Sequence, residues 1–350
     1  MNRSIPSGAI VVVTLLTASM SAAATPLSDQ NNYRISTTVP LGAPDRWDYV
    51  VYDPDSLRVY VAHGDRVTVV NGASGAVIGA VVGMPGGTHG IAISHATGEG
   101  YTDDGKAGEV VAFDLQTLKV VKRIKAESDA DGIVFDPSSG HVFAIDGDSG
   151  KVTVIDPRTD AVVATVDAGG GLEFGVAGEN GKFYVDGAEK NEIVRIDTAT
   201  NAADAHWPMS TCVKPHGLAI DGVHHRLFVS CSNEVMVVMN ADSGAVIATL
   251  PIGEGTDFAS FDPVRHLAFS SNRDGTLSVI TEISPDKFES LPPIKTQIGA
   301  RTMALDPKSG RIFLVTADMT MDKAAAPNDH RHRNHVKPGS VRLLFLDRTP

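Results

Sequence analysis

The chain has 350 residues, of which 42% are apolar and 21% charged, a balance typical of a folded globular protein. Its 30 basic and 42 acidic residues give a formal charge of −12, which argues against a nucleic-acid coat, because phosphate binding needs a basic surface. Two cysteines are too few for a disulfide scaffold, and no run of about 18 apolar residues predicts a membrane span.

The first 24 residues have the layout of a secretory signal peptide. Arg3 is the only charge before Asp29, residues 9–16 form a short apolar core, and Ala22 and Ala24 fit a small-residue cleavage site. We expect residues 25–350 to be the mature protein, periplasmic or secreted, with one positive charge fewer than the whole chain. An uncleaved membrane anchor is the alternative.

A repeat of about forty residues runs through the mature chain. Seven related segments start at positions 48, 89, 131, 173, 216, 257 and 301, with residues 131–137 (DGIVFDP) and 257–263 (DFASFDP) as examples. Such a fixed period is the signature of an architecture built from one repeated supersecondary unit.

Each repeat carries four short strand signals. In the third repeat these are residues 132–136, 141–145, 151–156 and 161–166, where Val and Ile alternate with a period of two. The segments between them are rich in Asp, Pro, Ser and Gly, which form tight turns. Four antiparallel strands repeated seven times predict an all-β fold, a seven-bladed β-propeller in a single domain.

The last repeat lacks a fourth strand at the end of the chain. Its first three strands are expected at 301–306, 311–316 and 341–347, and residues 33–39 have the pattern of a fourth. We predict that this N-terminal strand completes the last blade and closes the ring, which removes two open sheet edges.

Paired strand sequences such as residues 150–166 (GKVTVIDPRTDAVVATV) and 235–253 (VMVVMNADSGAVIATLPIG) resemble those of the YVTN-repeat (YncE-type) bacterial β-propeller family. The resemblance covers about residues 33–347 and implies an exported seven-bladed propeller. Similar propellers include lactonases, a streptogramin lyase, amine dehydrogenase subunits and non-catalytic binders, so the resemblance implies the fold rather than one activity. DNA binders also occur among them, and the acidic charge argues against that partner here.

The residue that opens each repeat is expected at the mouth of the central channel, because the first strand of each blade lines that channel. Carboxylates converging on one axis repel one another unless a cation lies among them. We therefore expect a divalent metal or another cationic ligand. Oxygen donors suit Ca²⁺, Mg²⁺ or Mn²⁺, and the imidazoles add Zn²⁺ or Cu²⁺. A solvated ring, or an anionic or neutral ligand, is the alternative. The seven residues, called the mouth ring below, are Asp48, His89, Asp131, Glu173, His216, Asp257 and Arg301.

Within this set, we expect Asp48, Asp131 and Glu173 to hold the metal. The ends of the second strands are expected at the same mouth, which makes His63 and Asp104 candidate ligand contacts. Asp257 and Trp47 complete the candidate ligand-binding residues, with packing between blades as the alternative for Trp47.

If the site is catalytic, His89 or His216 would be the general acid or base, and Arg301 would bind a substrate carboxylate or an oxyanion. The simplest reaction is attack of a metal-bound water on a small ester or lactone, by a hydrolase or lyase. The alternative is a non-catalytic periplasmic binder or scaffold for a protein, cell-wall or nucleic-acid partner. No haem, Walker or nucleophile-elbow motif is present.

Cys212 and Cys231 are both expected at the mouth, and in an exported protein they predict a disulfide, with a copper site as the alternative. Residues 318–339 are the one long insertion and carry the histidine-rich segment 330–335. We expect a solvated loop there; a lid, a metal-binding tract or an anion-binding patch are the alternatives. His224 and His225 lie in a turn on the opposite face, where we expect solvent exposure.

Overall fold

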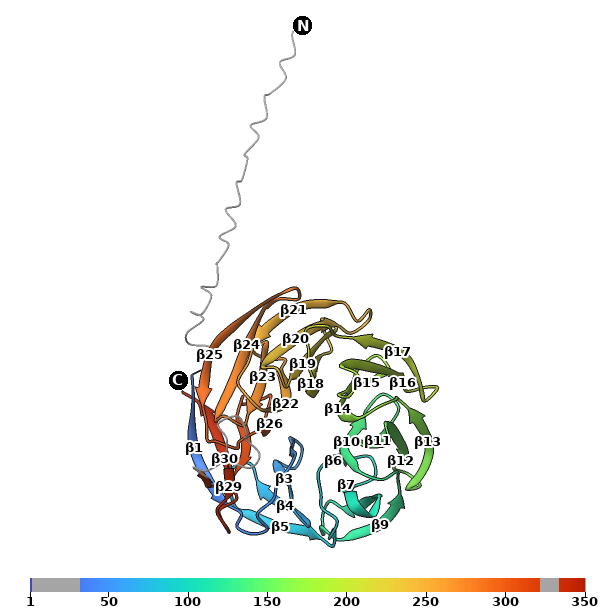
Figure 1. Cartoon of the computed structure of the whole chain (residues 1–350), viewed down its shortest axis with the longest axis vertical. Helices are drawn as coiled ribbons and strands as arrows, with labels where there is room; N and C mark the ends of the chain where they lie inside the picture. The colour runs from blue at the N-terminus through green and yellow to red at the C-terminus, as the bar shows by residue number, and fades with distance from the viewer. Residues whose placement is uncertain (2–31, 322–333, 350) are drawn as a thin grey trace.

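The protein is described here from a computed structural model, in which residues 32–321 and 334–349, together with Met1, are placed. Seven four-stranded antiparallel sheets stand around a central axis, which confirms the predicted all-β, seven-bladed propeller (Figure 1). The predicted signal peptide and residues 322–333 of the insertion lie outside the described residues.

The strands follow the repeat, four to a blade, with the first strand of each blade innermost (Figure 1). Blades 1 and 2 contain β2 (Val50–Asp53), β3 (Arg58–His63), β4 (Arg66–Asn71), β5 (Val77–Val82), β6 (Ile91–Ser94), β7 (Glu99–Asp104), β8 (Glu109–Asp114) and β9 (Val120–Lys125). Blades 3 and 4 contain β10 (Ala130–Asp136), β11 (His141–Asp146), β12 (Lys151–Asp156), β13 (Ala161–Asp167), β14 (Leu172–Ala177), β15 (Lys182–Gly187), β16 (Glu192–Asp197) and β17 (Ala202–Pro208). Blades 5 and 6 contain β18 (Pro215–Asp221), β19 (Arg226–Cys231), β20 (Val235–Asn240), β21 (Val246–Pro251), β22 (Thr256–Asp262), β23 (Leu267–Asn272), β24 (Thr276–Ser284) and β25 (Lys287–Lys295).

The seventh blade contains strands from both ends of the chain. It is built from β26 (Thr302–Leu305), β27 (Ile312–Thr316), β30 (Arg342–Arg348) and β1 (Tyr33–Pro40). β1 is the outermost strand and pairs antiparallel with β30, from Tyr33 opposite Arg348 to Pro40 opposite Arg342. The side chains of Tyr33 and Val39 are buried in this blade.

The turn between the first and second strands has one geometry throughout the repeat. A residue with a positive φ, a conformation that glycine adopts without strain, directly precedes the second strand in six blades and lies two residues before it in the seventh. Four blades place glycine there. The residues at this position are Leu57, Gly98, Gly140, Gly181, His225, His266 and Gly310.

The core consists of apolar layers between neighbouring blades. Phe143 of blade 3 stacks on Phe183 of blade 4 with ring centroids 4.5 Å apart, and both side chains are fully buried. Phe228 of blade 5 stacks in the same way on Phe261 of blade 6, at 5.1 Å. Side chains therefore hold the blades together, while hydrogen bonds hold the strands within each blade. In the described residues, no helix has the length and hydropathy needed to cross a membrane.

Candidate functional site

β-bulges direct the mouth ring into the channel. In β10, Ala130 pairs with Asp146 and Gly132 with Ile145, which leaves Asp131 between them without a partner across the ladder. His216 in β18 and Asp257 in β22 occupy the same unpaired position. A bulge re-aims one side chain, so these residues face the axis rather than a neighbouring strand.

The residue after each mouth-ring position decides how closely neighbouring blades approach. A Cβ at Gly90 would lie 2.3 Å from the backbone nitrogen of Ile133, and one at Gly217 only 2.5 Å from that of Ala259. Glycine is therefore required where first strands of adjacent blades touch.

In blades 1, 4 and 6 an aromatic residue replaces this glycine, and the three side chains meet across the axis. Tyr49 lies 4.9 Å from Phe174 and 5.8 Å from Phe258, and Phe174 lies 5.0 Å from Phe258, between ring centroids. This aromatic layer lies directly beneath the mouth ring. This layer was not predicted from the sequence, although the residue after the repeat start is visibly Gly in three repeats and aromatic in three others, with Thr302 in the seventh.

Arg301 neutralises part of the acidic ring. Its guanidinium forms an ion pair with Asp257 and lies 3.9 Å from the carboxylate of Asp48. Burial raises the pKa of Asp48 to about 6, because the opposing effect of Arg301 does not outweigh desolvation and the charge of Asp257. The same two carboxylates raise the pKa of Arg301, although its burial acts the other way.

His89 is held by a buried carboxylate that the sequence analysis did not single out. Its Nδ1 lies 2.7 Å from Oδ2 of Asp103, whose Oδ1 accepts the backbone N–H groups of His89 and Gly90. Asp103 is fully buried near the end of β7, at the position of Ala62 in blade 1, Ile145 in blade 3 and the buried Asp186 in blade 4. An aspartate at a strand position that is apolar in the repeats of blades 1 and 3 is the feature of the sequence that could have identified this residue.

The pKa of His89 reflects two opposing effects. Burial lowers it, but the hydrogen bond and charge of Asp103, with smaller contributions from Asp131 and Asp48, raise it to about 9. His89 is therefore an imidazolium at neutral pH.

On the other side of the ring, His216 Nδ1 lies 3.2 Å from Oε2 of Glu173. Glu173 and other carboxylates raise the pKa of His216 against the effect of its burial. Asp186 of β15 is fully buried near Glu173, and neither of its carboxylate oxygens has a hydrogen-bond partner among the described residues, so burial raises its pKa well above the ordinary value.

Asp131 differs from the rest of the mouth ring because no cation or N–H group is bonded to it in the described part of the chain. Burial and the charge of Asp48 raise the pKa of Asp131 well above the ordinary value, and His89 offsets this only in part. Ligand atoms of Asp131, Asp48 and His89 lie within 4.8 Å of one another. The structure therefore brings together two of the three predicted metal ligands and His89, and pairs Glu173 with His216 instead.

Two other predicted ligand contacts are buried, and a third is partly buried between blades. His63 is 1% exposed and its Nδ1 lies 3.0 Å from the hydroxyl of Thr68. Asp104 is 2% exposed and accepts the backbone N–H of Gly86. Trp47 packs against the apolar layer between blades 1 and 7.

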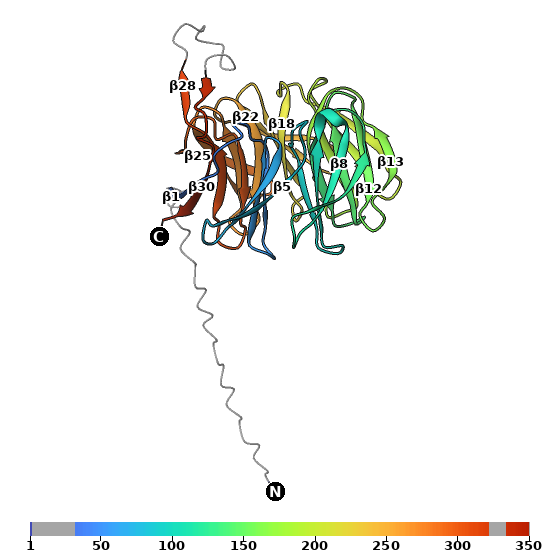
Figure 2. The ribbon, with the colours of Figure 1, turned by 90° about the horizontal axis from the view of Figure 1, so that it is seen from below.

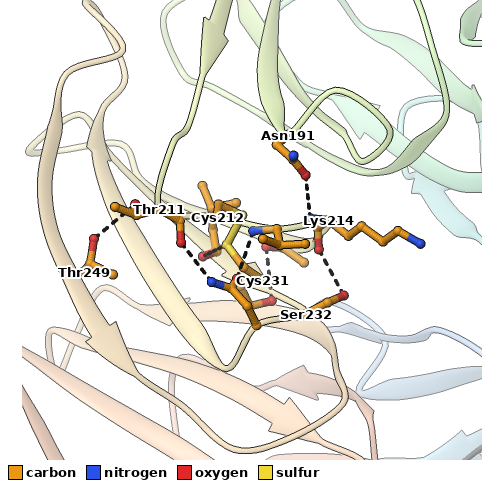
Figure 3. The surroundings of a disulfide bond; sticks show 12 residues. Asn191, Thr211, Cys212, Lys214, Cys231, Ser232 and Thr249 are labelled. Atoms are coloured by element: carbon orange, nitrogen blue, oxygen red, sulfur yellow. Dashed lines mark hydrogen bonds between the residues drawn. A yellow bond between two sulfur atoms is a disulfide. The ribbon is translucent and has the colours of Figure 1, made fainter.

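The predicted disulfide between Cys212 and Cys231 is confirmed (Figure 3). It joins the end of β19 to the segment that leads into His216. Hydrogen bonds reinforce this link. The backbone N–H of Lys214 donates to the side chain of Asn191 (Figure 3), and that of Val213 donates to the side chain of Asn233.

The described ends of the insertion form a short ribbon. β28 (Met319–Met321) pairs with β29 (Asn334–Val336) and rises above one face of the disc (Figure 2). Residues 330–333 of the histidine-rich segment lie outside the described residues.

The fold and the mouth ring define a class: a β-propeller with a charged channel mouth above an aromatic layer. No protein-family model matches the chain, and no curated protein matches it. Solved structures are similar in fold. Hydrazine synthase of Kuenenia stuttgartiensis matches at 13% identity and a TM-score of 0.67, over 76% of this chain and 91% of that one.

Two further structures are "Structure of U3-55K", with 9% identity and a TM-score of 0.73, and the WD40 repeats of RRP9, with 10% and 0.71. Both similarities cover 90% of this chain, with 98% and 97% of the other. At these identities the likeness shows the fold alone, and membership of the YVTN-repeat family is not established by it.

The contact between His89 and Asp103 predicts that the stability of the fold depends on pH. The pKa of His89 is about 9 in the fold against an ordinary 6.5, so its stabilising effect is complete below pH 6.5 and lost as the pH rises through 9. Between pH 6.5 and 9.5, the wild type should lose roughly 2–3 kcal/mol of unfolding free energy relative to His89→Gln.

NMR titration of the imidazole signals checks this directly. His63 serves as the internal control, because burial lowers its pKa. A His89 signal that titrates at or below pH 6.5 would contradict the assignment.

Proposed function

We propose that the protein is an exported, non-catalytic binding propeller that receives a cationic group of a protein partner beside Asp131. The observation that carries the proposal is the half-buried carboxyl of Asp131, which has no bonded cation or N–H donor among the described residues. Removing a carboxylate from water without a partner is costly, and a bound cation would remove that cost.

The other charges of the mouth ring support a binding role. His89 is tied to Asp103, His216 to Glu173, and Arg301 to Asp257. Each of these cations lies beside a carboxylate, so within the mouth ring Asp131 is the position where added positive charge is favoured. A lysine or arginine side chain from a partner has the required charge and length.

The second candidate function is binding of a divalent metal by Asp48, His89 and Asp131. It is favoured because the ligand atoms of these three residues all lie within 4.8 Å of one another. Metal binding would require His89 to lose its proton, because only the neutral imidazole is a ligand. The hydrolase or lyase reading, with a lactone or ester substrate, depends on this candidate. The WD40-type fold neighbours support the binding role only as examples of the fold.

The test replaces Asp131 with asparagine, which keeps the shape and removes the charge. Binding of a fluorescent hexalysine peptide should weaken by about tenfold or more, and added salt should reduce the wild-type affinity. The melting temperature of Asp131→Asn should rise at pH 8, because the uncompensated carboxylate destabilises the fold there. This gain should vanish in acid, where the wild-type carboxyl is neutral too.

Asp148→Asn is the matched control, because it removes the same charge from an exposed loop between β11 and β12. Equal loss of hexalysine binding in both variants would show that only net charge matters, and would contradict the proposal. Mn²⁺ binding that is lost in Asp131→Asn, with hexalysine binding unchanged, would instead support the metal candidate.

A further inference from the structure

A second cluster of ionisable side chains lies at the opposite face of the disc, where the turns between the first and second strands of blades 5 and 6 are found. His224 comes from the turn between β18 and β19, His266 from the turn between β22 and β23, and Glu282 from β24. Ligand atoms of these three residues lie within 4.8 Å of one another. The cluster takes no part in the channel mouth.

The length of the third strand in blade 6 explains how a glutamate reaches the two histidine turns. The third strands of blades 1 to 5 have six residues each, whereas β24 has nine. Glu282 lies in the extension, where the backbone N–H of Glu282 donates to the carbonyl of His266 at 2.9 Å. The extended hairpin therefore fixes a carboxylate beside both histidine turns.

Glu282 is buried, and one of its carboxylate oxygens has no hydrogen-bond partner among the described residues. Its side chain is 1% exposed, and its Oε1 accepts no hydrogen bond although it lies 3.1 Å from Nδ1 of His224. The reason is that Nδ1 of His224 also lies 2.6 Å from Oδ2 of Asp221, and one N–H cannot serve both carboxylates. A buried carboxylate oxygen thus faces the histidine without a proton to accept.

The distances fit a metal centre. His224 Nδ1 is 3.1 Å from Glu282 Oε1, and His266 Nδ1 is 3.4 Å from Glu282 Oε2. Ligands of one tetrahedral Zn²⁺ at bond lengths of about 2.0–2.1 Å are separated by about 3.3 Å. The two imidazole planes are inclined by 34° with centroids 6.1 Å apart, so both nitrogens approach the same carboxylate.

We propose that His224, His266 and Glu282 bind a divalent transition metal of the Zn²⁺ type. Binding replaces the Nδ1 proton of His224, which passes to solvent, and satisfies the orphaned oxygen of Glu282. The ion links the turns of blades 5 and 6 at the face opposite to the disulfide. It acts as a structural cross-link between two blades.

The experiment measures Zn²⁺ binding by the full mature chain. Because residues 330–335 also contain histidines, it uses a background with His330→Ala, His332→Ala and His335→Ala. We expect one Zn²⁺ per chain, release of protons on binding, and a melting temperature that rises with Zn²⁺ concentration. Co²⁺ bound at the same site should show the visible absorption of tetrahedral coordination.

Two variants locate the ion. His266→Ala removes a side chain that is 52% exposed, so folding should be unaffected, and Glu282→Gln keeps the shape of the buried group. Each should weaken Zn²⁺ binding by at least about a hundredfold. His225→Ala is the matched control, because His225 also pairs with a carboxylate, Asp242 at 2.9 Å, but has no second histidine partner.

Unchanged Zn²⁺ affinity in His266→Ala and in Glu282→Gln, or no saturable binding in the background chain, would overturn the proposal. Binding lost in Asp131→Asn but kept in His266→Ala would also overturn it and would place the ion at the channel mouth. The outcome is independent of the proposed peptide binding, which is measured with hexalysine and without metal.

Discussion

A chain that begins at Leu41 is expected to lose cooperative unfolding. The truncation removes β1, which pairs with β30 along its whole length and buries Tyr33 and Val39. Burial of two such side chains is worth about 3–6 kcal/mol, and the lost ladder leaves unpaired groups along β30. Because folded domains are stable by only about 5–15 kcal/mol, this loss is comparable with the total. Thermal and urea melts followed by circular dichroism measure it.

A chain that begins at Asn32 is the control, since it removes the residues before β1 and keeps the strand. Adding a synthetic peptide of residues 32–41 to the shorter chain should restore a cooperative melt, because the strand can pair in trans. An unchanged melt of the chain that begins at Leu41 would show that the ring does not depend on this strand.

The fold could be predicted because the repeat encodes local information. Period-two strands and Asp-Pro or Gly turns recur in each unit, so each repeat independently supports the same four-stranded blade. The predicted strands at 132–136 and 151–156 match β10 and β12 to within two residues. Where the strand or turn pattern is weak in one repeat, the other six repeats still indicate the same blade.

The site could be predicted only in part, because its chemistry depends on contacts between repeats. Alignment of the seven starts placed Asp131 and its neighbours at the mouth, but the hydrogen bond between His89 and Asp103 depends on how β6 and β7 pair. Likewise, the repeat places His224 in a turn, where we expected solvent exposure, yet its side chain is only 29% exposed beside Glu282. The extension of β24 that causes this breaks the repeat instead of following it.

Arg301→Ala should strongly destabilise the protein, because it removes the cation that pairs with the carboxylates of the mouth ring. Asp257 would lose its ion-pair partner and Asp48 its nearest cation, so two carboxylates would share the mouth unpaired. We expect a loss of roughly 3 kcal/mol at pH 8, the lower end for a broken buried ion pair, because 23% of the Arg301 side chain is exposed. Arg158→Ala, which breaks a surface pair with Asp156, should have little effect.

The pH dependence and a second substitution test the electrostatic cause. Because the pKa of Asp48 is already about 6 with Arg301 in place, the deficit of Arg301→Ala should shrink as the pH falls below 6 and this carboxyl takes up a proton. Adding Asp257→Asn to Arg301→Ala should recover part of the loss at pH 8, because one of the two orphaned charges is then gone. A deficit that is independent of pH and is not reduced by Asp257→Asn would mean that lost packing of the Arg301 side chain, rather than its charge, stabilises the channel mouth.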